Sequence, residues 1–334
     1  MSKSIFGRIK EFHFENGFRR LFRSVLKKLF LLLIPIQIFL LMGTPFYFNK
    51  FNYNIDLTSR KFSDLVTDPS FIKDRLKSQV EKKYVGQMSK APFGICYIHG
   101  FSASRKEIEP VVTNVARLLG ANLFFARLKG HGYENPEILK TVVAQDWIQD
   151  AIECVEVAAR TGDRVILMGS SLGGSLAALI ARNTKYNIHS LILISPNFGL
   201  KDQRAFILAG FYGGYIADYI FKGERSFEPI NEEQRIAWTT RYPSSILKEV
   251  MRITMAANQT DFSKLYTPTY LAFSKNDEIL DLNAMDAKYL QIKANKRMDA
   301  DSSYTNHIIA GDIMNPKGTP QLQKNIYSFI KANY

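Results

Sequence analysis

Hydrophobic and polar positions follow a regular rhythm after about residue 92. Short runs rich in β-branched and aromatic residues alternate with longer segments in which apolar residues recur at helical spacing. The short runs predict strands at 93–99, 121–128, 164–168, 190–195 and 269–273. The longer segments predict helices at 106–119, 146–160 and 171–182. Strands that are apolar throughout and separated by helices are typical of an α/β fold, a mostly parallel sheet with helices on both faces.

The pattern before this body is different. Residues 29–48 carry no charge, and a helix of 20 residues spans about 30 Å, the thickness of a bilayer's hydrocarbon core. Pro35 and Gln37 interrupt the run, and Pro45 marks its far end. We expect a transmembrane anchor. A cleaved signal peptide is an alternative, although Pro45 and bulky aromatics after Gly43 make a poor cleavage site. A helix that lies on the membrane surface or is buried in the protein is the third possibility.

The distribution of charge predicts how the anchor is oriented in the membrane. The chain carries a net charge of +13, of which +7 falls in residues 1–50, and eight of the nine positive residues there precede the apolar run. This asymmetry predicts a cytoplasmic N-terminus and an extracytoplasmic body, which would be periplasmic in a bacterium. The alternatives are secretion after signal cleavage and a membrane-associated body in the cytoplasm. Residues 1–28 alternate basic and apolar residues, which indicates an amphipathic segment on anionic lipid. Residues 49–92 are polar and weakly helical, and we expect a stalk and a helix that leads into the body.

Composition excludes several classes of protein. At 334 residues, 38.1 kDa, 46% hydrophobic and 22% charged, the chain is neither disordered, nor fibrous, nor a multi-span membrane protein. Because the positive charge gathers at the N-terminus, the body is not expected to bind nucleic acid. Cys96 and Cys154 are too few for a disulfide framework or a cysteine-rich zinc site. Both lie in apolar runs and are expected to be buried free thiols. No metal or cofactor is expected, and the oligomeric state is not readable.

The segment Gly169-Ser170-Ser171-Leu172-Gly173 carries the strongest chemical signal. It directly follows a predicted strand and directly precedes a predicted helix. The chain must turn sharply at Ser171, and small residues two positions before and after allow the close approach. The free N–H groups at the start of the helix can then face an anion. Ser171 is the predicted nucleophile.

Two loops at neighbouring strand ends complete the expected site. In His99-Gly100-Phe101, the backbone N–H of Phe101 can point to the same space as that of Leu172, and two such donors make an oxyanion hole. His99 is expected to hydrogen-bond the loop rather than to act in catalysis. His131, between two glycines, is expected to line the site.

A serine nucleophile needs a base, and His307 is the only histidine that follows the last predicted strands. His13 precedes the apolar run, and His189 lies at the start of a strand, on the wrong edge of the sheet. The acid that orients the base should lie between the serine and the histidine in the chain. Asp277 ends a predicted strand and is the first candidate. Its neighbours Glu278 and Asp281 remain alternatives, whereas Asp261 and Asp286 lie away from the strand end.

Taken in order, HGF, RLKGHG, GSSLGG, SKNDEI and NHII resemble the α/β-hydrolase superfamily, most closely the group of monoacylglycerol lipases and bacterial carboxylesterases. The resemblance covers about residues 93–334. It implies Ser171 as nucleophile, Asp277 as acid, His307 as base, and the amides of Phe101 and Leu172 as oxyanion hole. Two departures bear on substrate choice: Ser170 replaces a larger elbow residue, and no glycine directly precedes His307.

The resemblance also implies a helical cap at about 197–266 and an esterase that forms an acyl-enzyme. The cap contains an apolar run at 206–221, where Phe206, Phe211 and Tyr215 are candidate pocket residues. This run is expected either to pack on the core or to form a lid that touches an acyl chain or membrane lipid. The expected substrate is an acyl ester or a monoacyl lipid. A thioesterase, an acyltransferase, a serine peptidase, or a binding protein without catalysis remain alternatives.

Overall fold

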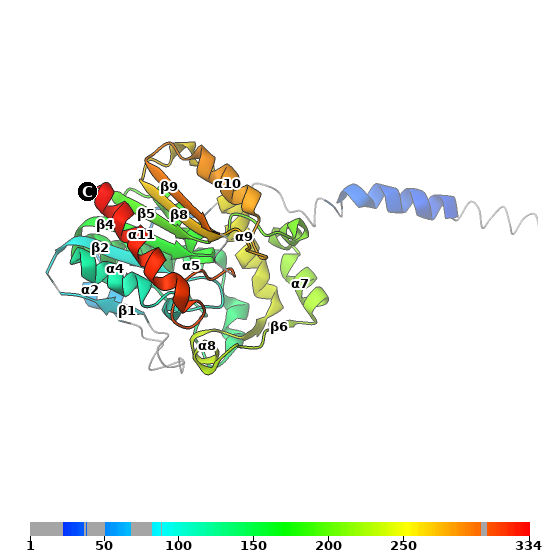
Figure 1. Cartoon of the computed structure of the whole chain (residues 1–334). Helices are drawn as coiled ribbons and strands as arrows, with labels where there is room; N and C mark the ends of the chain where they lie inside the picture. Colours follow the sequence, from blue (N-terminus) through cyan, green and yellow to red (C-terminus); the bar gives the residue numbers. More distant parts are fainter. Residues whose placement is uncertain (1–22, 37, 39–50, 68–81, 88, 302–305) are drawn as a thin grey trace, which may run out of the picture.

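The computed structural model describes residues 23–36, 38, 51–67, 82–87, 89–301 and 306–334, and Figure 1 shows their arrangement. A seven-stranded sheet lies at the centre, in the order β1-β3-β2-β4-β5-β8-β9. Strand β1 runs antiparallel to β3, and all the other neighbours are parallel. The strands are β1 Lys83–Val85, β2 Ala91–Ile98, β3 Asn122–Phe125, β4 Gly162–Ser170, β5 Ile188–Ile194, β8 Thr269–Ser274 and β9 Lys296–Asp301.

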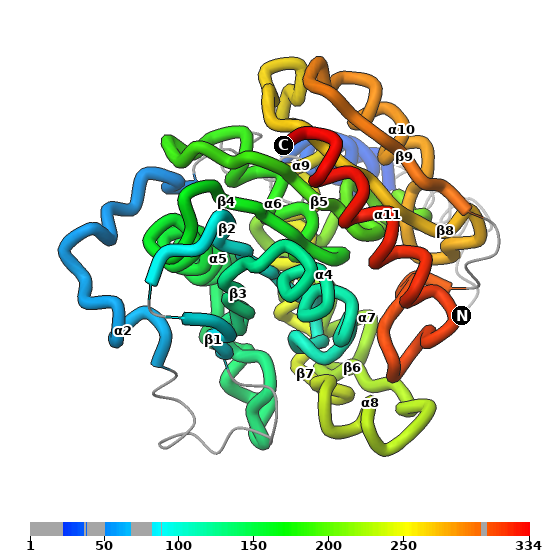
Figure 2. The backbone as a smooth tube through the Cα atoms, turned by 60° about the vertical axis from the view of Figure 1, so that its left-hand side comes forward, coloured from blue at the N-terminus to red at the C-terminus, as the bar shows by residue number. Residues whose placement is uncertain are grey.

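Each central strand is apolar on both sides, because helices cover both faces of the sheet. In β2, Phe93, Ile95 and Tyr97 join one buried cluster, and Cys96 and Ile98 join the other. The helices α4 Val111–Leu119 and α11 Thr319–Ala332 cover the first face, as Figure 2 shows. The second cluster packs against α5 Ala144–Thr161, α6 Leu172–Asn183, α9 Leu247–Gln259 and α10 Leu282–Gln291.

The mostly parallel α/β fold expected from the sequence is therefore confirmed, with all five predicted strands and all three predicted helices present. The helix predicted at 106–119 is shorter, since Arg105–Glu107 form a 3-10 turn (η2) and Pro110 lies directly before α4. Strand β9 was not predicted, because its sequence KRMDAD is polar and each of its residues is only half-buried at the sheet edge.

The segment 49–92 differs from the expected stalk. Residues 51–67, with the short helix α2 Phe62–Val66, lie against α5 and bury Phe51, Leu57 and Leu65. Arg160 of α5 donates hydrogen bonds to two carbonyl oxygens of this segment. Strand β1 then joins the central sheet. Phe51, Tyr53, Ile55 and Leu57 alternate with polar residues, and this apolar set packs against the buried cluster to which α5 belongs. The helical positions expected at 71–80 lie outside the described residues.

Residues 23–36 are helical, and their apolar side chains are exposed except for the half-buried Ile34. Most of the anchor expected at 29–48, and most of the basic segment 1–28, lie outside the described residues. In the part of the chain that the structure describes, no helix is both long and apolar enough to cross a membrane.

The prediction of two free thiols was wrong, because Cys96 and Cys154 form a disulfide. Cys96 lies in β2 and Cys154 in α5, and packing of α5 on the sheet brings their Cα atoms to 5.4 Å. This separation is within the range that a disulfide requires. Both residues are fully buried. The bond links β2, the strand that precedes Gly100, to α5, which packs on it.

The interval between β5 and β8 forms the cap, and it is not wholly helical. A two-stranded sheet, β6 Glu224–Ser226 and β7 Arg241–Pro243, crosses it. The apolar run at 206–221 is divided into a 3-10 helix (η4) Gln203–Ala209 and α7 Gly213–Phe221. A short helix α8 Glu232–Ala237 follows, and α9 returns the chain to the main core.

Candidate active site

Ser171 lies at the sharp turn between β4 and α6, in a backbone conformation that side-chain-bearing residues rarely adopt. Its φ is 50° and its ψ is −117°. The flanking glycines make room for this turn. A Cβ at Gly169 would lie 2.2 Å from the carbonyl oxygen of Gly173, and a Cβ at Gly173 would lie 2.1 Å from that of Ile98. The G-x-S-x-G spacing is thus required by close approach of the backbone.

The structure brings together Ser171, His307 and Asp277, which the sequence analysis had named from three distant segments. The Nε2 atom of His307 lies 3.0 Å from the Oγ of Ser171. Its Nδ1 atom lies 2.7 Å from the Oδ2 of Asp277. The side chain of Asp277 is fully buried, and that of His307 is 16% exposed. The histidine therefore bridges a buried carboxylate and a hydroxyl, and its outer edge is open to solvent.

The environment of Asp277 favours the charged carboxylate. Burial raises its pKa, but the hydrogen bond and charge of His307 and the N–H groups of Ile279 and Leu280 lower it, so that the pKa lies below its usual value. The two alternatives for the acid are placed elsewhere. Asp281 accepts two backbone N–H groups as the N-cap of α10, and Glu278 is exposed.

The two expected oxyanion donors lie beside the serine. Leu172 is the first residue of α6, so the helix itself offers no acceptor to its N–H. The loop that contains Phe101 approaches from β2: a Cβ at Gly100 would lie 3.1 Å from the Cβ of Ser171. The side chain of Phe101 packs edge-on against Tyr242 of the cap and against His131.

His99 and His131 are both fully buried, and their rings pack against each other. His99 Nε2 accepts the N–H of Leu128, so its Nδ1 donates to the carbonyl of Gly100. Burial lowers the pKa of His99 to about 4 and that of His131 well below its usual value. His99 thus joins the ends of β2 and β3 as a neutral ring. His131 packs on Phe101 and Trp147.

The three cap candidates contact other parts of the cap. Phe206 packs within the cap's own small core. Phe211 and Tyr215 line a cavity of about 240 Å³ between α7, η5 (Ser244–Ile246) and the segment 139–143. Both are also widely exposed, at 64% and 77%, and Tyr219 on the same helix is 89% exposed. The cap therefore packs on the core through α9, on which η4 lies, and presents aromatic side chains to solvent.

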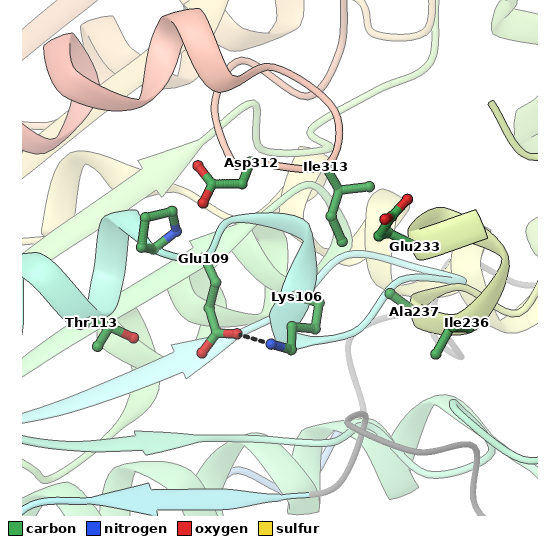
Figure 3. A pocket seen from close by; sticks show the side chains of 9 residues that line it. Lys106, Glu109, Thr113, Glu233, Ile236, Ala237, Asp312 and Ile313 are labelled. Atoms are coloured by element: carbon green, nitrogen blue, oxygen red, sulfur yellow. Dashed lines mark ion pairs between the residues drawn. The ribbon is translucent and has the colours of Figure 1, made fainter. Parts of the chain in front are cut away.

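A second cavity, of about 420 Å³ and larger than the one in the cap, lies beside the 101–110 loop (Figure 3). Its walls come from that loop and α4, from α8, and from the segment that follows His307. Lys106 and Glu109 form an ion pair at its edge, and Glu233 and Asp312 add two further carboxylates. Ala237 and Ile313 of its lining pack in one apolar cluster with Ala103 and Ile308, which lies next to His307. The apolar part of this lining thus belongs to a cluster that extends to the residue next to His307.

Within the described residues, no three histidine, cysteine, aspartate or glutamate side chains gather in a way that could hold a metal ion. One polar residue near the site was not identified from the sequence. Glu107 is buried, and its carboxylate accepts the N–H of Gly100. It lies where a helix was predicted, and a carboxylate at such a position is ordinarily exposed, so the sequence carries no signal for it.

Comparisons with known proteins identify the family and the fold of this chain. Residues 91–301 match the family described as Serine aminopeptidase, S33. No curated protein sequence matches the chain. Many solved structures do. One, from a study of LipS and LipT, two metagenome-derived lipolytic enzymes, has a TM-score of 0.64 at 17% identity and covers 77% of this chain and 99% of its own.

Two other similar structures are monoacylglycerol lipases. That of Paleococcus ferrophilus has a TM-score of 0.58 at 13% identity, covering 77% of this chain and 100% of its own. A soluble variant of the Saccharomyces cerevisiae monoglyceride lipase, in complex with a substrate analogue, has a TM-score of 0.56 at 13% identity, covering 75% and 91%. At these identities the structures establish the shared fold.

Proposed function

This chain belongs to the serine aminopeptidase S33 family of α/β-hydrolases, and from that membership we propose that it is a membrane-anchored serine hydrolase that cleaves carboxylic esters of acyl lipids. The observation that carries the proposal is the position of His307, in hydrogen-bonding distance of both Ser171 and Asp277. A hydroxyl, an imidazole and a buried carboxylate in this order are the parts of a nucleophilic triad.

The proposed reaction follows from these positions. Ser171 Oγ attacks the acyl carbonyl while His307 Nε2 takes its proton. Asp277 holds the ring through Nδ1 and stabilises the imidazolium. The N–H groups of Phe101 and Leu172 receive the negative charge on the carbonyl oxygen. His307 then protonates the leaving alcohol, and the same steps with water release the acid from the acyl-enzyme.

The cap supports an acyl-lipid substrate. Phe211, Tyr215 and Tyr219 present exposed aromatic rings on one part of it, and such a surface favours contact with lipid. Monoacylglycerol lipases are among the proteins that share this fold. Each methylene of an acyl chain that is buried on binding contributes about 0.8 kcal/mol, so four carbons favour the longer ester by roughly a hundredfold.

A chain-length series tests the proposal. The full-length protein in detergent is assayed on esters of two to sixteen carbons, on the matching thioesters, and on aminoacyl amides, with Ser171→Ala as the control. We expect hydrolysis of esters with a maximum at medium or long chains and none by the Ser171 variant. A maximum at two to four carbons contradicts the lipid substrate. Hydrolysis of the amides alone identifies a peptidase and contradicts the esterase.

The proposed location is the outer face of a membrane, with residues 29–48 as anchor and the N-terminus in the cytoplasm. Two observations support it: the positive charges that precede the apolar run, and the disulfide between Cys96 and Cys154, since such bonds persist in oxidising compartments. Alkaline phosphatase fused after Tyr334 should be active, because it folds only outside the cytoplasm. Inactive phosphatase, together with fluorescence of a green fluorescent protein fused at the same place, would show the opposite orientation and contradict the proposed location.

A further inference from the structure

Gly100 lies between two peptide groups, and buried side chains hold both of them. Its N–H donates to Glu107 Oε1 at 2.7 Å. Its carbonyl oxygen accepts from His99 Nδ1 at 2.8 Å and from the N–H of Ala103 at 3.3 Å. In a trans peptide the N–H points opposite to the carbonyl. The Phe101 N–H belongs to the same peptide as the Gly100 carbonyl, so His99 and the Ala103 N–H hold it directly. Glu107 holds the preceding peptide, on the other side of the Gly100 Cα.

Glu107 is almost completely buried and has a second partner on the strand behind it. The hydroxyl of Tyr97 in β2 donates to the same Oε1 atom at 2.8 Å. On its own segment, Arg105 pairs with Glu109. In the segment after His307, Gly311 packs closely against the backbone carbonyl of Glu107. No cation forms an ion pair with the Glu107 carboxyl in the described part of the chain.

These surroundings favour a neutral acid. Burial raises the pKa of Glu107 to about 8, although the bonds from Gly100 and Tyr97 lower it. The position of the carboxyl makes its charge important. A Cβ at Gly100 would lie 3.1 Å from Glu107 Oε2 and 3.1 Å from Ser171 Cβ, so these two atoms are separated by at most twice that distance. An ionised Glu107 would repel a negative charge that develops beside Ser171.

We propose that Glu107 is a positioning residue for the oxyanion hole: as a neutral acid it anchors the Gly100 N–H and so, together with His99 on the Gly100 carbonyl, fixes the Gly100 backbone from which the Phe101 N–H faces the substrate oxygen, and it keeps negative charge away from that oxygen. The proposal rests on the proposed hydrolase function. It assigns to a residue outside the triad both the geometry of one oxyanion donor and an upper pH limit for the reaction.

The test compares Glu107→Gln and Glu107→Ala with Glu156→Gln. Glu156 is a matched control, because it is also a buried glutamate that accepts a hydrogen bond from a tyrosine hydroxyl, that of Tyr186. It differs in its place, since it lies on α5, where it pairs with Arg160. kcat and KM are measured on one ester from pH 5 to 10. Binding of an alkylboronic acid, which forms a tetrahedral anion on the serine, is measured in parallel. Circular dichroism confirms folding.

We expect Glu107→Ala to lower kcat on the order of 10- to 100-fold with little change in KM, and to weaken boronic acid binding by a similar factor. The wild-type kcat should fall as the pH rises through about 8, as Glu107 ionises. The isosteric Glu107→Gln cannot ionise, so it should keep kcat at neutral pH within a few fold and lose that alkaline decline. Glu156→Gln should match the wild type throughout.

A Glu107→Gln variant with the wild-type alkaline decline overturns the proposal, and this result does not depend on whether the alanine variant folds. Wild-type kcat and boronic acid binding in a folded Glu107→Ala variant overturn it as well. These outcomes differ from failure of the proposed function, in which the wild type itself neither hydrolyses esters nor binds the boronic acid.

Discussion

Ser171 illustrates how much a single residue can be predicted from its neighbours. The glycines at 169 and 173 are explained by backbone oxygens that leave no space for a Cβ, and the serine's positive φ is the conformation that this turn imposes. His307 followed from the order of segments, because residues at the carboxyl ends of parallel strands meet at one edge of the sheet. Local pattern and topology together sufficed to name these residues, and the structure places them in contact.

Glu107 and the two cysteines show the limit of such predictions. Glu107 belongs to a segment with helical spacing, and nothing in the sequence distinguishes a buried carboxylate there from an exposed one. The cysteines are 58 residues apart in the chain. Their pairing depends on which turn of α5 faces β2, and this register is set by packing over the whole sheet.

The role of Asp277 gives a prediction at the residue scale. Asp277→Asn should lower kcat on the order of 10³- to 10⁴-fold, because an amide nitrogen beside Nδ1 favours the wrong tautomer of His307. The matched variant is Asp281→Asn, which keeps the N-cap of α10 since asparagine caps helices equally well. It should retain activity. Steady-state values of kcat on one ester identify the acid. A severe loss of kcat in Asp281→Asn, with a mild loss in Asp277→Asn, would make Asp281 the acid.

At the scale of elements, the predictable strands were those buried on both faces. β2, β4, β5 and β8 are continuous apolar runs because helices cover both of their sides. β1 and β9 are the edge strands, and their residues are only partly buried, with Lys83 of β1 exposed. Their sequences therefore carry little apolar signal, and pairing with a neighbour determines their structure.

The disulfide between β2 and α5 should stabilise the fold by about 2–4 kcal/mol, chiefly by restricting the unfolded chain. Urea unfolding of the wild type with and without reductant measures this difference. The double variant Cys96→Ala/Cys154→Ala should show the lower stability and no response to reductant. Two thiols that react with an alkylating agent in the denatured, unreduced protein would show that the bond does not form.

Over the whole molecule, the sequence pattern predicts a charged and apolar N-terminal part followed by a folded body. In the structure, this body begins earlier in the chain than predicted. Residues 51–67 were assigned to a stalk, yet they cover α5 and belong to the body. The cap was predicted as helical, but it also contains the β6–β7 pair. The segment 51–67 and the short strands of the cap gain their structure from contacts with distant elements, which the sequence pattern alone does not show.

The central claim is that Ser171 is the nucleophile of a serine hydrolase. The most direct measurement is mass spectrometry of the folded protein after reaction with a fluorophosphonate, compared with Ser171→Ala and His307→Ala. We predict one phosphonyl group on the peptide that contains Ser171, none in the Ser171 variant, and greatly slowed labelling in the His307 variant. Labelling of a different serine, or unlabelled wild-type protein, would contradict the account.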